Sequence, residues 1–259
     1  MTIKKIIKLF EKGNVSVSGL RGTGKDMLMS NVCVRRKKPY VSNVDYGGMY
    51  MPLRFDLLDC GNNTYKDFIS GQVKRYEYPY ADGTDIYISD CGIYFPSQHF
   101  EALNREYKNF TTFQALTRHL GACNLHFNSQ NLNRVWDKLR EQSDIYIKCK
   151  SCKVIFKKIV IQSGYIYEKY QSAVDDVMPF RMKNPHGIFA KQTSREEFKS
   201  LYLLKKQDYT NTHGKITPFT LIYINKSTYD TRRFKQMLKE GYIDEKREEN
   251  NSKPTKKIS

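Results

Sequence analysis

The chain has 259 residues, of which 44 are Lys or Arg and 27 are Asp or Glu, giving a net charge of +17. Hydrophobic residues make up 39% and aromatic residues 13% of the sequence, which is enough for a buried core and excludes a wholly disordered chain. The positive excess indicates a polyanionic partner: nucleic acid, an acidic membrane surface or a charged substrate. Residues 131–259 carry most of it, with 27 basic against 15 acidic residues.

No run of about 18 apolar residues occurs, so we expect no transmembrane segment. Residues 1–5 lead into an apolar stretch that is too short for a cleavable signal. We therefore expect a soluble, intracellular protein. Six scattered cysteines in a chain of this length predict reduced thiols. Cys149 and Cys152 form a C-x-x-C pair, which we interpret as structural because no second Cys or His pair lies nearby to complete a zinc site.

The first part of the chain alternates short strands with helices. Apolar spacing predicts a helix over residues 2–12, a strand over 15–17, a helix over 26–34 and a strand over 39–43. Further on we expect a hairpin of residues 74–78 and 85–90, helices at 97–107 and 112–120, a strand at 124–127, a helix at 132–141 and a strand at 144–147. This alternation predicts an α/β fold with a mostly parallel sheet flanked by helices.

After residue 148 the pattern changes to short strands, at 154–156, 159–161 and 165–167, which predict an antiparallel extension. A helix at 194–203, a strand at 219–223 and a helix at 231–240 follow. We expect a main domain with its β extension over 1–180, a small basic C-terminal α/β region over 181–243 and a disordered charged tail over 244–259.

A glycine-rich segment, Gly19-Leu20-Arg21-Gly22-Thr23-Gly24-Lys25, fits the phosphate-binding pattern G-x-x-x-x-G-K between a predicted strand and a predicted helix. Backbone N–H groups and the helix N-terminus would surround a β-phosphate, and Lys25 would reach the β- and γ-oxygens. The loop therefore predicts that the α/β fold is of the P-loop NTPase class and that residues 1–180 form an ATPase domain. Asp26 follows where a Ser or Thr normally binds Mg²⁺. Its carboxylate is a candidate metal ligand, unless it turns away from the phosphates.

The strand 85–90 ends in an acid, Asp90, which is a candidate Mg²⁺ ligand and catalytic residue. Cys91 follows where many ATPases have a Glu that polarises water. Glu101 and Glu106 are possible replacements.

Polar side chains follow the next predicted strand. Gln130 and Asn128 are candidate sensors of the γ-phosphate, although capping of the next helix is an equal alternative. Arg118, Arg134 and Arg140 are candidate arginine fingers acting across a subunit interface.

Several segments follow one another in the order seen in zonular occludens toxin-like ATPases of filamentous phages, within the HerA/FtsK group of DNA-pumping and packaging ATPases. They are the phosphate loop, residues 40–43, the strand 86–90, Thr117-Arg118-His119-Leu120-Gly121, Phe127-Asn128-Ser129-Gln130 and residues 138–140. The resemblance spans roughly residues 13–170. Asp26, Cys91 and the lack of a membrane span depart from that family.

The resemblance implies an ATP-driven DNA translocase of viral genome packaging or virion assembly, with ATP and Mg²⁺ as cofactors. It implies a homo-oligomeric ring on DNA, together with capsid or assembly proteins, in the cytoplasm of a bacterial host or on the virion. Two alternatives stay open: a nucleoside monophosphate kinase, and an adaptor that binds nucleotide without hydrolysing it.

Overall fold

The computed structural model describes residues 1–53, 83–97, 124–156, 158–181 and 195–227, which belong to one compact unit. Its helices are α1 (Ile3–Lys12), α2 (Lys25–Arg36), α4 (Cys91–Tyr94), the 3-10 helix η2 (Leu132–Arg134), α6 (Asp137–Glu141), α7 (Tyr170–Val174) and α8 (Arg195–His213). Its strands are β1 (Val15–Ser18), β2 (Tyr40–Ser42), β3 (Tyr50–Pro52), β4 (Asp85–Ile88), β5 (Leu125–Ser129), β6 (Ile145–Ile155), β7 (Ile159–Tyr167) and β8 (Ile216–Ile224).

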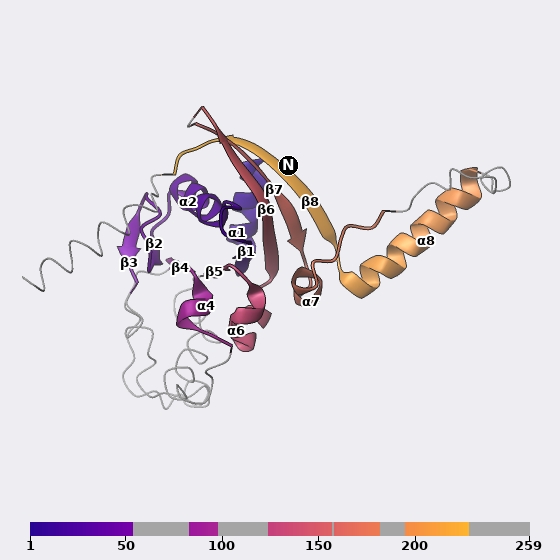
Figure 1. Ribbon diagram of the computed structural model, residues 1–259, viewed down its shortest axis with the longest axis horizontal. Helices are drawn as coiled ribbons and strands as arrows, with labels where there is room; N and C mark the ends of the chain where they lie inside the picture. Colours follow the sequence, from indigo (N-terminus) through magenta and orange to yellow (C-terminus); the bar gives the residue numbers. More distant parts are fainter. Residues whose placement is uncertain (54–82, 98–123, 157, 182–194, 228–259) are drawn as a thin grey trace, which may run out of the picture. The chain divides into compact units, whose positions relative to one another are not determined.

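The strands form one sheet in the order β3-β2-β4-β5-β1-β6-β7-β8 (Figure 1). All pairs from β3 to β6 are parallel, whereas β7 is antiparallel to both β6 and β8. The expected α/β class, with a mostly parallel sheet and an antiparallel extension, is confirmed. The carboxyl ends of β1, β5 and β4 meet at one edge of the sheet, which is where ligands bind in folds of this type.

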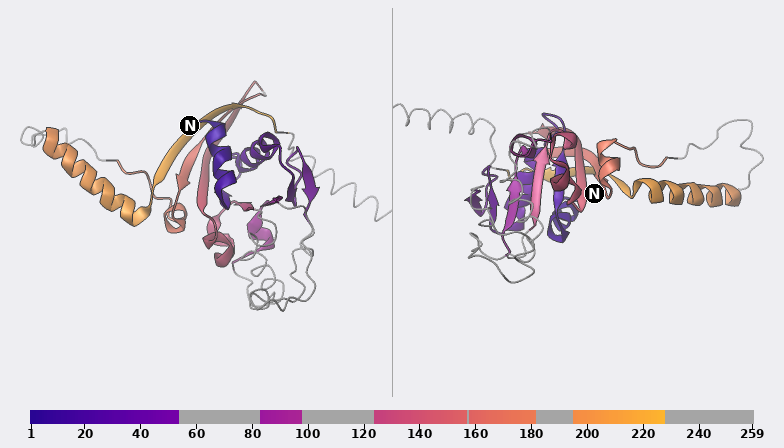
Figure 2. Two further views of the ribbon diagram at one scale, coloured as in Figure 1. Left: turned by 180° about the vertical axis from the view of Figure 1, so that it is seen from behind. Right: turned by 90° about the horizontal axis from the view of Figure 1, so that it is seen from below.

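Helices cover both faces of the parallel part of the sheet. On one face α1 packs against α2, and the Phe10 ring of α1 lies 4.9 Å from the His126 ring of β5. On the other face an apolar cluster includes Ile86 and Phe127 of the sheet and the large side chain of Trp136. Figure 2 gives two further views of these layers.

Several details differ from the sequence prediction. The helix expected over 132–141 is broken into η2 and α6. The cause is that Val135 pairs with Pro96 and the backbone N–H of Trp136 donates to the Phe95 carbonyl. The strands expected at 154–156, 159–161 and 165–167 are parts of two long strands, β6 and β7, and α8 runs ten residues past the expected end at 203. Burial of alternate residues along β7 keeps the strand continuous across the weakly apolar residues 162–164.

Several predictions fall outside the described residues: the strand at 74–78, the helices at 97–107 (except for residue 97), 112–120 and 231–240, and the tail from 244. The hairpin expected between 74–78 and 85–90 is wrong, because β2 and β5 pair in parallel with the two edges of β4 and leave none for an antiparallel partner. The division of the chain into regions at residue 180 stays a prediction. The strand expected at 219–223 lies within β8, which pairs with β7. In the part of the chain that the structure describes, no helix combines the length and the apolar character that crossing a bilayer requires.

His126 is buried in this sheet without a charge partner. Its Nδ1 accepts a hydrogen bond from the Val15 N–H at 3.2 Å, and its Nε2 has no hydrogen-bond partner among the described residues. Burial, with a contribution from the Arg36 guanidinium, holds the pKa of the imidazole well below its usual value. The folded protein therefore keeps His126 neutral.

This burial predicts a stability that falls on mild acidification. Below about pH 6.5 the unfolded chain takes up a proton at His126 and the folded chain does not, so the free energy of unfolding should drop by up to about 1.4 kcal/mol per pH unit. Urea unfolding of the wild type and of His126→Gln, between roughly pH 7.5 and 5.5, measures this. An equal pH dependence in both proteins would contradict the assignment.

Candidate functional site

The predicted phosphate loop connects β1 to α2 and is tightly turned. Gly24 forms the N-cap of α2 with φ +83°, and Gly22 has φ +84°. These left-handed conformations favour glycine. The Thr23 backbone N–H and side-chain hydroxyl both donate to the Leu20 carbonyl, at 3.2 and 2.7 Å. The loop thus leads directly into the N-terminus of a 12-residue helix, whose dipole favours an anion.

The antiparallel extension braces this loop from outside. The buried Gln162 of β7 donates from Nε2 to the carbonyls of Thr23 and Gly24, at 3.3 and 3.0 Å. Its Oε1 accepts a hydrogen bond from the Tyr223 hydroxyl of β8 at 3.0 Å. Sequence reasoning missed Gln162, because nothing in the local pattern distinguishes it from a solvent-facing strand residue.

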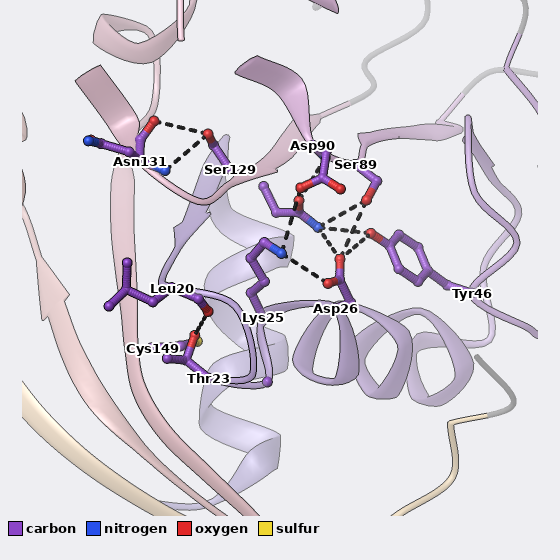
Figure 3. Close-up of polar contacts among 12 residues, drawn as sticks. Leu20, Thr23, Lys25, Asp26, Tyr46, Ser89, Asp90, Ser129, Asn131 and Cys149 are labelled. Atoms are coloured by element: carbon purple, nitrogen blue, oxygen red, sulfur yellow. Dashed lines mark hydrogen bonds and ion pairs between the residues drawn. The ribbon is translucent and has the colours of Figure 1, made fainter. Parts of the chain in front are cut away.

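Lys25, the first residue of α2, lies between two carboxylates (Figure 3). Its Nζ is 3.1 Å from Asp26 Oδ2 and 3.6 Å from Asp90 Oδ1. The Lys25 side chain is only 8% exposed, whereas that of Asp90 is 42% exposed. The ammonium group is therefore held at the sheet edge beside a partly open acid.

Asp26 points into the site and does not turn away from it. Its Oδ1 accepts a hydrogen bond from Asn128 Nδ2 at 2.8 Å, and it lies 3.4 Å from both the Tyr46 hydroxyl and the Ser89 hydroxyl. Figure 3 shows the Tyr46 and Ser89 side chains pointing toward this carboxylate. The network fixes the Asp26 carboxylate at the end of β4 and β5.

Asn128 also holds the end of β4. Its Oδ1 accepts from the Asp90 N–H at 2.8 Å, where Asp90 adopts φ +47°. Asn43, just after β2, bonds the Ser89 N–H and carbonyl at 2.7 and 3.1 Å. Two side-chain amides thus position the residue that carries the candidate metal-binding acid.

Cys91 lies in the apolar cluster and is fully buried. Burial raises the pKa of its thiol well above the usual value, so the thiol stays protonated. Cys91 thus packs in the core at the position where many ATPases have a Glu that polarises water. Glu101 and Glu106 lie outside the described residues.

The other candidates are dispersed. We call Lys25, Asp26, Asp90 and Asn128 the Lys25 cluster. Gln130 and Arg21 are exposed and lie outside this cluster. Of the two candidate sensors, Asn128 is therefore the one that the structure brings into it. The Arg140 guanidinium lies 4.9 Å from the centre of the Tyr170 ring and donates to the carbonyls of η2. Arg118 lies outside the described residues.

A cavity of about 330 Å³ opens beside the loop, between the carboxyl ends of β1 and β5, residues 148–150 of β6 and the region of helix α7. Thr23 and Gln130 line one side, and Lys148, Lys150 and Asp176 line the other. Burial alone would raise the pKa of Asp176, but the two ammonium groups hold it below its usual value. The volume is within the range of small-molecule sites.

No family model and no curated protein matches the chain. Solved structures do. The N-terminal domain of zonular occludens toxin from Neisseria meningitidis aligns at 13% identity and TM-score 0.39, over 60% of this chain and 83% of its own. The genome packaging NTPase B204 of Sulfolobus turreted icosahedral virus 2, in complex with ATP-gammaS, aligns at 17% identity and TM-score 0.35, over 52% and 73%. Both are of the kinds that the sequence motifs resemble.

The two left-handed glycines of the loop make a matched pair for a test. A Cβ at Gly22 would meet no atom within 4 Å, whereas one at Gly24 would lie 2.6 Å from Cys152 Cβ and 2.7 Å from its Sγ. Gly22→Ala should therefore lower the free energy of unfolding by about 1 kcal/mol through backbone strain alone. Gly24→Ala adds a steric clash and should cost about 3 kcal/mol.

Urea unfolding of both variants measures the difference. The double variant Gly24→Ala/Cys152→Gly serves as the control, because removing the Cys152 side chain should recover the steric part of the loss. Equal losses in the two single variants would show that the extension does not contact the loop as described.

Proposed function

We propose that this chain binds Mg²⁺–ATP at the loop between β1 and α2, hydrolyses it, and uses the energy to move DNA in viral genome packaging or virion assembly. The observation that carries the proposal is the convergence of Lys25, Asp26, Asp90 and Asn128 where three adjacent parallel strands end, at the N-terminus of α2. Phosphoryl transfer depends mainly on positioning and charge, which such a cluster supplies.

The triphosphate would occupy the N-terminus of α2. Its oxygens compete with Asp26 and Asp90 for the Lys25 ammonium, so we expect Lys25 to exchange a carboxylate partner for the β- and γ-phosphates. A phosphate bound there would also accept hydrogen bonds from backbone N–H groups of the loop.

The two acids suit a Mg²⁺ ion that arrives with the nucleotide. Mg²⁺ is commonly held by one or two carboxylates, with phosphate oxygens and waters completing its shell. Asp26 and Asp90 both lie within 3.6 Å of Lys25 Nζ, and Asn128 bonds the Asp26 carboxylate and the Asp90 N–H. Magnesium would screen the negative charge between the acids and the phosphates. Asn128 would act as a positioning residue.

The cavity beside the loop is the candidate site for the ribose and base. It begins at loop residues Gly19, Leu20 and Thr23 and extends between β6 and α7, away from the Lys25 cluster. A nucleotide whose phosphates lie on the loop therefore has room for its nucleoside there, next to Lys148 and Lys150.

DNA is the proposed polyanion because the net charge of +17 is concentrated after residue 130. A ring of identical copies would let an arginine of one subunit complete the site of the next, with Arg118, Arg134 and Arg140 as candidates. Capsid or assembly proteins and a location in the bacterial cytoplasm belong to the same proposal.

The second candidate is an adaptor that binds nucleotide without hydrolysis. The burial of Cys91 favours the adaptor. Cys91 follows Asp90 at the position where many ATPases have a water-polarising Glu, and the residue there is a buried thiol instead. A nucleoside monophosphate kinase is the third, and no specific contact supports it.

Replacing Lys25 tests the proposal. Lys25→Ala should weaken ATP binding at least about tenfold and abolish turnover, because the phosphates lose their main charged partner. Lys8→Ala is the matched control, since Lys8 is an exposed lysine of α1. The measurements are calorimetric ATP titration and phosphate release, each with and without DNA.

The outcomes separate the three functions. Turnover that rises with DNA supports the translocase, ATP binding without turnover supports the adaptor, and transfer to a nucleoside monophosphate supports the kinase. Unchanged ATP affinity in Lys25→Ala would contradict the nucleotide site itself.

A further inference from the structure

One face of the antiparallel extension is apolar and exposed near the turn between β6 and β7. The strand register places Ile155, Ile159 and Ile224 in one row across the three strands, and Ile161 and Ile222 side by side in the next. Paired residues of antiparallel strands project to the same face. Ile155, Ile159, Ile222 and Ile224 are 37%, 38%, 69% and 64% exposed. We call these five isoleucines the isoleucine face.

The turn next to this face presents an aromatic ring to solvent. Phe156 is 87% exposed and has φ +50°, a left-handed conformation that is costly for a bulky residue. Glycine or asparagine would form this turn with less strain. Val154, on the opposite face of β6, is 46% exposed. The hairpin tip therefore displays apolar side chains on both faces. The ribbon places this tip at the end of the extension away from α7 (Figures 1 and 2).

The charge around the tip has one sign. Residues 145–167 and 216–226 contain no Asp or Glu. The described lysines near the tip are Lys153, Lys158 and Lys226, whereas Lys148 and Lys150 lie further along β6 and pair with Asp176. Lys153 lies in the row of Ile161 and Ile222, and Lys158 follows the turn; both side chains are exposed. A partner of this surface must offer negative charge next to apolar groups.

We propose that the hairpin tip docks onto an anionic lipid bilayer, with Phe156, Ile155 and Ile159 entering the interfacial region and the lysines lying among the headgroups. Aliphatic side chains gain free energy from the acyl boundary, and lysine stems extend so that their ammonium groups stay with the phosphates. A second copy of this face would bring lysines against lysines. Nucleic acid would pair the lysines but leave the isoleucines in water. This inference is independent of the proposed function.

Vesicle co-sedimentation of the full chain tests the proposal. We expect binding to phosphatidylcholine vesicles that contain phosphatidylserine and none to phosphatidylcholine alone. The double variant Ile155→Ser/Phe156→Ser should lower the vesicle-bound fraction about tenfold or more, because two buried apolar side chains are lost. Leu204→Ser, which changes a residue of α8 that is 61% exposed, is the matched control and should bind like the wild type.

A fluorescent variant reports on insertion directly. The native chain has a single tryptophan, Trp136, which is buried, so Phe156→Trp adds one exposed reporter. Its emission should shift to the blue on addition of the anionic vesicles and stay unchanged with phosphatidylcholine alone. This variant keeps the proposal testable even if the serine variant folds poorly.

Three results would overturn the proposal. They are no binding to either vesicle, binding without any shift in the Phe156→Trp emission, and a serine variant that keeps vesicle binding while losing self-association or DNA binding. The second would leave only electrostatic adsorption. The third would assign the isoleucine face to a second copy of the chain or to nucleic acid.

Discussion

The site depends on the side-chain amide of Asn128. Its Nδ2 donates to Asp26 Oδ1 of α2, and its Oδ1 accepts the Asp90 N–H at the end of β4. One buried residue of β5 thereby links the helix that follows the phosphate loop to the strand that carries the acid. An amide suits this place because it donates and accepts at once, whereas a carboxylate would repel Asp26 and a hydroxyl would not span both partners. The positions of Asp26 and Asp90 relative to Lys25 follow from it.

The antiparallel extension supports the same site from the other side. Gln162 of β7 holds two carbonyls of the loop, and Cys152 of β6 packs against Gly24 so closely that no side chain fits there. The long hairpin that braces the loop also ends in the exposed tip at Phe156. A shift of the β6–β7 hairpin would therefore move the loop carbonyls that Gln162 holds. A contact made at the tip and a ligand bound at the loop both act on this hairpin.

The sequence was most informative where a local pattern decides the structure. The glycine spacing predicted the loop, and the apolar run before Asp90 predicted β4, because both follow from neighbouring residues. The contacts of Asn128, Tyr46 and Gln162 come from separate elements brought together by the sheet order, which local periodicity does not encode. The burial of Cys91 could not be predicted for the same reason. Packing between α4 and β5 places its thiol in the core, so this residue does not take over the role of the usual Glu. The break between η2 and α6 likewise depends on pairing with the distant residue Pro96.

The most direct test of the central claim is a structure of the chain with Mg²⁺ and a non-hydrolysable ATP analogue. We predict that the terminal phosphates lie on the loop, that Lys25 Nζ leaves the Asp26 carboxylate for the phosphate oxygens, and that Asn128 still bonds both Asp26 and the Asp90 N–H. Phosphates bound elsewhere, or a Lys25 that stays paired with Asp26 beside a bound analogue, would contradict the account.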